Sequence, residues 1–210
     1  VHKTKTGNGC GEFVGLRVAV AVDGGRVNIR RRVAGRPKKG GRKRFVSEWR
    51  EPKVLTVYAL NDDGERDKRH RVVLDGTLGG ADSVFELLTY HLLRLGVHLA
   101  QKVVFLGDGA TWIWNRTGRL REALGMDTEQ FTEVLDYFHV VERLTELAAK
   151  KSRWTPEQRT AWVEEQKSKL KDGEASEVAA AAVALVKRNK QDRETEAAYW
   201  TRNRDRLGYG

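Results

Sequence analysis

The sequence has little that could cross-link the chain or anchor it in a membrane. Its 210 residues include one cysteine, Cys10, which cannot form an internal disulfide and excludes a cysteine-rich zinc ribbon. Apolar runs such as Leu16–Val22 are far shorter than the roughly 20 residues that a membrane span needs. No apolar segment follows a basic N-terminus, so no secretory signal is visible. We therefore expect a protein of a reducing cytosol with no membrane partner.

Acidic residues are scarce relative to basic ones. The chain has 39 Lys and Arg against 29 Asp and Glu, a formal net charge of +10. With 40% hydrophobic and 32% charged residues, the composition excludes a wholly disordered chain and fits a globular protein. The positive excess favours a polyanionic partner such as a nucleic acid. Because the chain starts at Val1 and stops at Gly210, we expect it to be a fragment.

Apolar segments in the first third of the chain predict three sequential antiparallel strands. Leu16–Val22 ends at Asp23-Gly24-Gly25, a turn signal that predicts a hairpin with Arg26–Arg32. Lys53–Leu60 predicts the third strand. The segment at 33–50 between them is rich in Gly, Lys and Arg and is too polar for a core.

Helices and strands are then predicted to alternate. Apolar residues at spacings of three and four predict an amphipathic helix that Asp82 or Ser83 caps and that Gly96 ends. The elements expected here are, in order, a helix at 82–95, a strand at 102–107, a helix at 120–124, a strand at 131–137 and a helix at 139–150.

From Trp154 onward only helices are predicted. Thr155 is placed to cap the first of them with Pro156 in its first turn, and Asp172-Gly173 separates it from the second. The expected helices are 157–171, 176–189 and 192–206. The predicted fold class is α/β, a mixed sheet in the order β-β-β-α-β-α-β-α with an appended all-α module. The predicted domains are an irregular lead-in at 1–15, a core at 16–152 and a helical domain at 153–210.

Three aspartates follow apolar runs at or beyond the ends of predicted strands: Asp23, Asp108 and Asp136. Carboxylates on neighbouring strands would form an oxygen-rich site suited to Mg²⁺ or Mn²⁺. Ordinary Asp-Gly turn chemistry is the alternative for the first two. Asp136 is followed three residues later by His139, which could join the site or serve as a structural histidine. Asp75, Asp82 and Asp127 lack a preceding buried strand and are interpreted as turn or cap residues.

Several ordered segments are similar to transposases of bacterial insertion sequences. They are Val22–Arg30, Trp49–Lys53, Val104–Asn115 and Val134–His139, and Tyr199–Arg206 shows a weaker similarity. Together they resemble the ribonuclease H-like core of DDE transposases, and Asp136-x-x-His139 resembles the Cys/Asp-x-x-His element of Mutator-like transposases.

The resemblance implies a function and a set of roles. Asp23 and Asp108 match the first two catalytic acids, which hold two Mg²⁺ or Mn²⁺ ions in the complete site, and Asp136 and His139 match the accessory pair. The implied activity is metal-dependent cleavage of transposon ends and strand transfer into target DNA. The implied setting is the bacterial cytosol and nucleoid, with a homo-oligomer as the active complex.

The third catalytic acid of the family, a glutamate, has no match before Gly210. Glu142 lies one turn after His139 but precedes the helical insertion that the glutamate follows in relatives. The glutamates of the helical module are predicted to face solvent: Glu157, Glu164, Glu165, Glu174, Glu177, Glu194 and Glu196. We therefore expect a catalytically incomplete chain whose missing glutamate is encoded shortly beyond Gly210.

A basic segment between the second and third predicted strands is a candidate for DNA binding. Its cations would bind phosphates regardless of sequence, although a solvated loop is an equal alternative. They are Arg30, Arg31, Arg32, Arg36, Lys38, Lys39, Arg42, Lys43 and Arg44. Trp112 and Trp114 flank Ile113, and this alternation suggests that one packs in the core while the other could stack on an unpaired base.

Two other functions fit the same sequence. One is a non-catalytic DNA-binding remnant of a transposase, which the absent glutamate favours. The other is an unrelated basic nuclease or RNA-binding module that uses a ribonuclease H-like fold. Metal-dependent strand nicking would favour the enzyme, and metal-independent DNA binding alone would favour the remnant.

Overall fold

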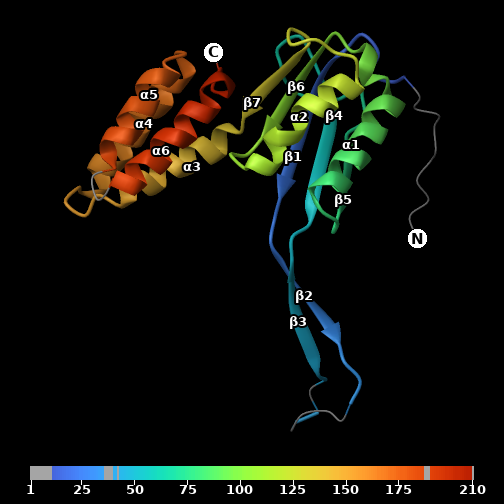
Figure 1. Ribbon diagram of the computed structural model, residues 1–210, viewed down its shortest axis with the longest axis horizontal. Coiled ribbons are helices and arrows are strands. Elements are labelled where there is room, and N and C mark those ends of the chain that lie inside the picture. Colours follow the sequence, from blue (N-terminus) through green and yellow to red (C-terminus); the bar gives the residue numbers. More distant parts are fainter. Residues whose placement is uncertain (1–10, 36–39, 42, 187–189, 210) are drawn as a thin grey trace. The chain divides into compact units, whose positions relative to one another are not determined.

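The computed structural model describes residues 11–35, 40–41, 43–186 and 190–209 (Figure 1). These residues form an α/β fold with six α-helices and a mixed five-stranded sheet in the order β5-β4-β1-β6-β7. Strands β2 and β3 form a second, two-stranded sheet. The chain divides into two compact units, residues 1–103 with 115–130 and residues 104–114 with 131–210.

One long antiparallel hairpin dominates the first unit. Strand β1 (Arg17–Gly24) pairs with β4 (Lys53–Leu60), and further along β2 (Val27–Arg32) pairs with β3 (Phe45–Arg50). The Gly25 amide donates to the Pro52 carbonyl oxygen over 3.0 Å, which joins the two ladders. Figure 1 shows β2 and β3 continuing from β1 and β4 as a ribbon.

The predicted tight hairpin between the first two strands is wrong. A two-residue hairpin turn generally needs positive φ at a glycine, and neither Gly24 nor Gly25 has it. The chain therefore runs on from β1 into β2. It turns back only beyond Val33, whose amide donates to the Arg44 carbonyl oxygen over 3.0 Å.

The core of the first unit lies between the sheet and α1 (Ala81–Leu95). Alternate residues of β4, Leu55, Val57 and Ala59, are fully buried. Helix α1 packs on β4 and β5 (Val73–Thr77) and buries Leu88 and Leu92 among other residues of its apolar face. Burial of this apolar stripe is what stabilises the amphipathic helix on the sheet.

The predicted C-terminal end of α1 is confirmed, and the predicted N-cap is wrong. Gly96 ends the helix with φ of 78°, as predicted, and its amide donates to the Leu93 carbonyl oxygen. At the other end Gly80 is the N-cap, and Asp82 lies inside the first turn, paired with Arg116 over 2.7 Å.

The predicted lead-in contributes one core residue. Residues 11–16 form turns, and the Phe13 side chain is fully buried. The Phe13 amide donates to the Leu95 carbonyl oxygen over 2.8 Å, and Gly11 donates to Arg94 over 3.1 Å. These bonds satisfy carbonyl groups that the end of α1 leaves without helical partners.

Strands β6 (Lys102–Gly107) and β7 (Phe131–Leu135) run parallel to each other. The Val103 amide donates to the Gln130 carbonyl oxygen over 2.7 Å, and the Asp136 amide donates to Gly107 over 2.8 Å, so both strands advance in the same direction. Helix α2 (Thr111–Ala123) connects them and starts earlier than the predicted helix.

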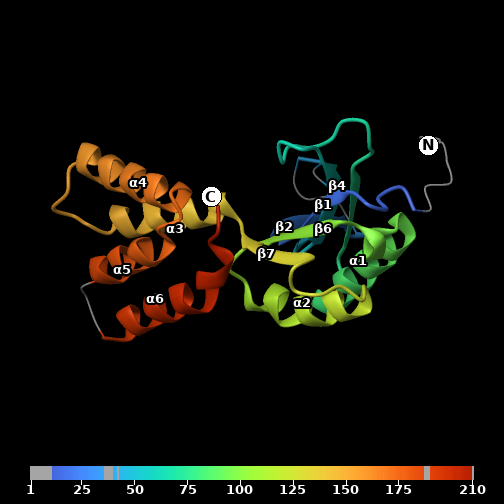
Figure 2. The ribbon, with the colours of Figure 1, turned by 90° about the horizontal axis from the view of Figure 1, so that it is seen from above.

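Four helices pack side by side in the second unit (Figure 2). They are α3 (Tyr137–Ala149), α4 (Pro156–Lys171), α5 (Ala175–Leu185) and α6 (Lys190–Asn203), and a 3₁₀ turn at Arg204–Arg206 follows. Thr155 caps α4 through a capping box with Gln158, as its position predicted. Leu144, Leu170 and Trp200 are buried between the helices. The predicted end of the second helix falls at 187–189, outside the described residues.

Candidate functional site

Asp108 stands at the junction of β6 and α2. Its Oδ1 accepts a hydrogen bond from the Ala110 amide over 2.8 Å, which turns the chain into the helix. The side chain is half-buried. The next residue, Gly109, has no room for a side chain, because a Cβ there would lie 2.6 Å from Cε2 of Tyr199.

Asp136 and His139 stand at the equivalent junction of β7 and α3. Asp136 is the N-cap of α3, and its Oδ1 accepts hydrogen bonds from the amides of Phe138 over 2.7 Å and His139 over 3.4 Å. The bond from the Asp136 amide to the Gly107 carbonyl oxygen holds the ends of β6 and β7 together. His139 lies in the first turn of α3, with Nδ1 3.7 Å from Oε2 of Glu142.

Asp23 lies near the end of β1, opposite Val54 of β4. Its neighbours Val20 and Val22 are buried, whereas the Asp23 side chain is exposed. One carboxylate oxygen accepts a hydrogen bond from the Gly24 amide over 2.7 Å. The rigid strand thus presents a carboxylate to solvent, as the sequence predicted.

Three of the predicted site residues form a group that could hold a metal ion. One ligand atom each from Asp23, Asp108 and His139 lies within 4.8 Å of the others. The two carboxylate oxygens suit Mg²⁺ or Mn²⁺, whereas the imidazole nitrogen suits a transition metal, so the mixed donor set favours Mn²⁺ over Mg²⁺. Asp136 is not in this group, because its carboxylate caps α3.

A buried polar cluster supports the Asp108 junction from within the second unit. Arg143 of α3 donates two hydrogen bonds to the carboxylate of Glu196 on α6, over 2.9 and 2.7 Å. Glu196 also accepts from Nε1 of Trp200 over 2.7 Å, and the Arg143 guanidinium lies 3.7 Å from the centre of the Tyr199 ring. That ring fills the space beside Gly109. Burial of the ring raises the pKa of the Tyr199 hydroxyl.

The sequence-based interpretation of Glu196 is wrong. Its side chain is only 8% exposed. The other six glutamates of the helical module are exposed, as predicted. Sequence reasoning also missed Arg143 and Tyr199. The spacing of four between Glu196 and Trp200, which places both on one helix face, is the signal that could have revealed the cluster.

The last described residues lie along β7. Arg206 pairs with Glu133 over 2.6 Å and stacks on Trp114, with its guanidinium 4.3 Å from the ring. The Tyr209 hydroxyl donates to the Leu135 carbonyl oxygen over 2.8 Å. Burial of the hydroxyl raises the pKa of Tyr209.

The two tryptophans after Asp108 do not alternate along a strand, because both belong to α2. Trp114 is buried and packs edge-on against Phe105, so it has the core role. Trp112 is half-buried. The alternation argument therefore does not assign a base-stacking role to either side chain.

The predicted DNA-binding cations fall into three groups. Arg30, Arg31 and Arg32 lie in β2 and are exposed, and Lys43 and Arg44 lie just before β3 and are exposed too. Arg36, Lys38, Lys39 and Arg42 lie outside the described residues.

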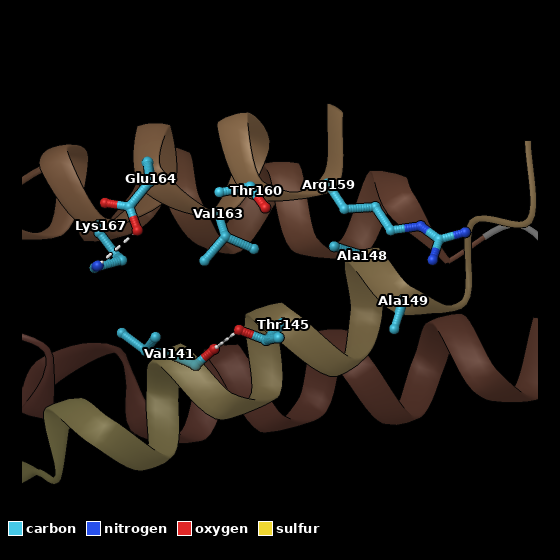
Figure 3. Close-up of a pocket in the computed structure, with 9 residues that line it drawn as sticks. All are labelled: Val141, Thr145, Ala148, Ala149, Arg159, Thr160, Val163, Glu164 and Lys167. Carbon is cyan, nitrogen blue, oxygen red and sulfur yellow. Dashed lines mark hydrogen bonds and ion pairs between the residues drawn. The ribbon is translucent and has the colours of Figure 1, made fainter. Parts of the chain in front are cut away.

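A groove of about 300 Å³ lies between α3 and α4 of the second unit (Figure 3). Val141, Ala148 and Val163 supply apolar surface, and Lys167 pairs with Glu164 at one end over 2.7 Å. None of the predicted site residues lines it. The groove is therefore separate from the candidate metal group.

Compared with known proteins, the chain matches no family model, no curated protein and no solved structure. Among the described residues, no helix combines the length and the apolar character that crossing a membrane requires.

Proposed function

We propose that the chain forms part of the catalytic core of a DDE-type DNA transposase with a ribonuclease H-like sheet. The order β5-β4-β1-β6-β7, with the candidate acids on β1 and after β6, is the support that the fold gives. The resemblance of the segments around Asp23, Asp108 and Asp136 to insertion-sequence transposases is the support that the sequence gives.

One observation carries the proposal. The sequence singled out Asp23, Asp108 and His139 as candidates from positions far apart in the chain, and ligand atoms of all three lie within 4.8 Å of one another. Two carboxylates so close together repel each other unless a cation or a proton intervenes. A divalent cation bound between the two carboxylates is the simplest way to offset this repulsion.

The chain's own residues would position the ion rather than attack the substrate. Asp108 is fixed by its bond to the Ala110 amide, and His139 is fixed by the capped start of α3. When bound, Mg²⁺ or Mn²⁺ would supply activation of water or a 3′-hydroxyl and stabilisation of the phosphate charge. No protein nucleophile is needed for phosphoryl transfer of this kind.

We further propose that neither Glu196 nor Glu142 serves as a third carboxylate ligand. Glu196 is engaged by Arg143 and Trp200, and Glu142 is an exposed residue 3.7 Å from His139. Glu142 is suited to orient the imidazole, as carboxylates beside metal-binding histidines commonly do. Two carboxylates and one imidazole would then bind a single divalent ion weakly.

The experiment that tests the proposal is a titration of the protein with Mn²⁺, followed by electron paramagnetic resonance and calorimetry. We expect one weak site that Asp23→Asn and Asp108→Asn each abolish. The matched controls are Asp63→Asn and Asp205→Asn, which remove the same charge at exposed positions and should leave Mn²⁺ binding unchanged. A second arm assays metal-dependent nicking of DNA that carries a candidate transposon end, by this chain and by a longer natural form of the protein where one exists.

Two results would contradict the proposal. One is Mn²⁺ binding that is unaffected by either site variant while all variants remain folded. The other is DNA binding by the longest natural form of the protein with no metal-dependent nicking, which would favour a non-catalytic DNA-binding protein.

A further inference from the structure

The β2–β3 ribbon has two faces of different chemistry. In an antiparallel pair, residues directly opposite each other lie on the same face, and successive residues alternate between faces. Trp49 is opposite Asn28, and Phe45 is opposite Arg32. This register assigns Phe45, Trp49, Arg30 and Arg32 to one face, which we call the tryptophan face.

The tryptophan face combines exposed aromatic rings with arginines that form no ion pair with any described carboxylate. Trp49 is 61% exposed and Phe45 is 54% exposed. The guanidinium of Arg26 lies 5.4 Å from the Trp49 ring, which places Arg26 at the same face. Among the paired residues of the ribbon, 27–32 with 45–50, no acidic residue lies on this face, and Glu51, which follows β3, pairs with Lys53 over 3.6 Å.

The opposite face, which we call the valine face, is less basic. It carries Val27, Ile29 and Val46, together with Arg31, Arg50 and Glu48. Glu48 pairs with Arg50 over 3.0 Å, so one of the two arginines is neutralised. The charge asymmetry singles out the tryptophan face as the one complementary to a polyanion.

We propose that the tryptophan face binds an unpaired strand of DNA. This inference rests on the proposed function for its choice of DNA. Arginines that alternate with exposed aromatic rings suit single-stranded nucleic acid, because phosphates pair with the cations and every base can stack on a ring. The four-residue step from Phe45 to Trp49 spans about 13 Å of extended strand, enough for the rings to contact different bases.

The test compares two double variants that remove the same charge from opposite faces. They are Arg30→Ala with Arg32→Ala, and Arg31→Ala with Arg50→Ala. Binding of a labelled single-stranded oligonucleotide and of the matching duplex is followed by fluorescence anisotropy in EDTA at several salt concentrations. We expect the tryptophan-face pair to weaken single-strand binding about tenfold and to reduce the salt slope by about 1.4. The valine-face pair should change the affinity less than about threefold at the same net charge.

A matched pair of apolar variants isolates the role of stacking. Trp49→Ala should weaken single-strand binding about tenfold with no change in salt slope, because a ring contributes stacking and no charge. Val46→Ala, on the valine face, should leave binding unchanged. All these side chains are exposed, so circular dichroism and the unfolding midpoint should match those of the wild type.

Several outcomes would overturn the inference. Equal losses from the two arginine pairs would show that net charge alone attracts DNA. A Trp49→Ala variant with normal DNA binding but weakened self-association in light scattering would assign the face to a second copy of the chain. EDTA separates this test from the metal site, so face-dependent binding would stand even if metal-dependent nicking failed. A wild type that binds no DNA would overturn both the inference and the proposed substrate.

Discussion

Arginines lie over aromatic rings in both compact units, but their surroundings differ. In the second unit Arg143 lies 3.7 Å from the Tyr199 ring and is neutralised by the buried carboxylate of Glu196. In the first unit Arg26 lies 5.4 Å from the ring of Trp49, and no described carboxylate pairs with it. The same residue types thus hold helices together in one region and face solvent in the other. The comparison indicates that an arginine stacked on an aromatic ring can bind a ligand only where no carboxylate neutralises the guanidinium.

The largest contrast is expected from the two tryptophans. Trp200 is 2% exposed and donates to Glu196, so Trp200→Ala should lower the free energy of unfolding by about 3–5 kcal/mol. Trp49→Ala removes an exposed ring and should change the free energy of unfolding by less than about 0.5 kcal/mol. Urea denaturation of both variants measures the contrast. Similar losses would show that the ribbon is packed against another part of the protein.

The second contrast concerns the acid that neutralises Arg143. Glu196→Gln keeps the shape of the side chain but leaves a partly buried guanidinium without its counter-charge. We expect a loss of about 2 kcal/mol in the free energy of unfolding. The matched control is Glu194→Gln on the same helix, whose exposed pair with Lys190 should contribute less than about 0.5 kcal/mol. Equal effects of the two variants would contradict the buried role of Glu196.

A smaller effect is expected where the Tyr199 ring meets the loop after β6. Gly109→Ala places a Cβ against that ring and should cost about 1–2 kcal/mol of unfolding free energy. In a Tyr199→Ala background the same substitution should cost almost nothing, which a double-mutant cycle measures. Gly118→Ala in α2 meets no neighbour within 4 Å and serves as the control. A Gly109→Ala penalty that persists without the ring would assign the strain to the backbone.

The smallest effect is expected from Asp67, whose hydrogen bonds with the exposed Arg69 lower the pKa of its carboxyl group from 3.8 to about 2. A carboxyl group with a lowered pKa adds stability that is complete above its unfolded pKa and is lost as pH falls through the folded pKa. The stability difference between wild type and Asp67→Asn should therefore be constant above about pH 4 and shrink toward pH 2. Urea midpoints at several pH values test this, with exposed Asp63→Asn as a control. If the stability difference between wild type and Asp67→Asn does not depend on pH, the ionised carboxylate of Asp67 is not the source of the stabilisation.

The sequence predicted the elements that bury an apolar face, together with the exposed strand β2, in which Val27 and Ile29 alternate with polar residues, but it did not predict β3 or β5. Strands β1, β4, β6 and β7 and helix α1 follow from apolar runs and helical spacing because each buries an apolar face. Strand β3 was missed because both of its faces are exposed and it lies in the segment at 33–50, whose many Gly, Lys and Arg residues indicated a loop. Strand β5 was missed because Asp75 and Gly76 interrupt its apolar pattern. In both strands backbone pairing, rather than burial, defines the element.

The candidate site could be predicted in part for a similar reason. Asp23 and Asp108 were found because each follows a buried strand, and a strand end fixes where a carboxylate points. The capping role of Asp136 was missed, since it depends on where α3 begins rather than on strand position. Glu196 was hidden because charged residues surround it in the sequence while its helix turns it inward.

The central claim is that Asp23, Asp108 and His139 together hold a divalent metal ion. The most direct measurement is anomalous X-ray diffraction from crystals of the protein grown with Mn²⁺. The account predicts one Mn²⁺ peak whose ligands include a carboxylate oxygen of Asp23, a carboxylate oxygen of Asp108 and a ring nitrogen of His139. Two results would contradict the account. In one, Mn²⁺ binds at other residues and none is found at these three side chains. In the other, the ligand atoms of the three side chains lie too far apart to share one ion.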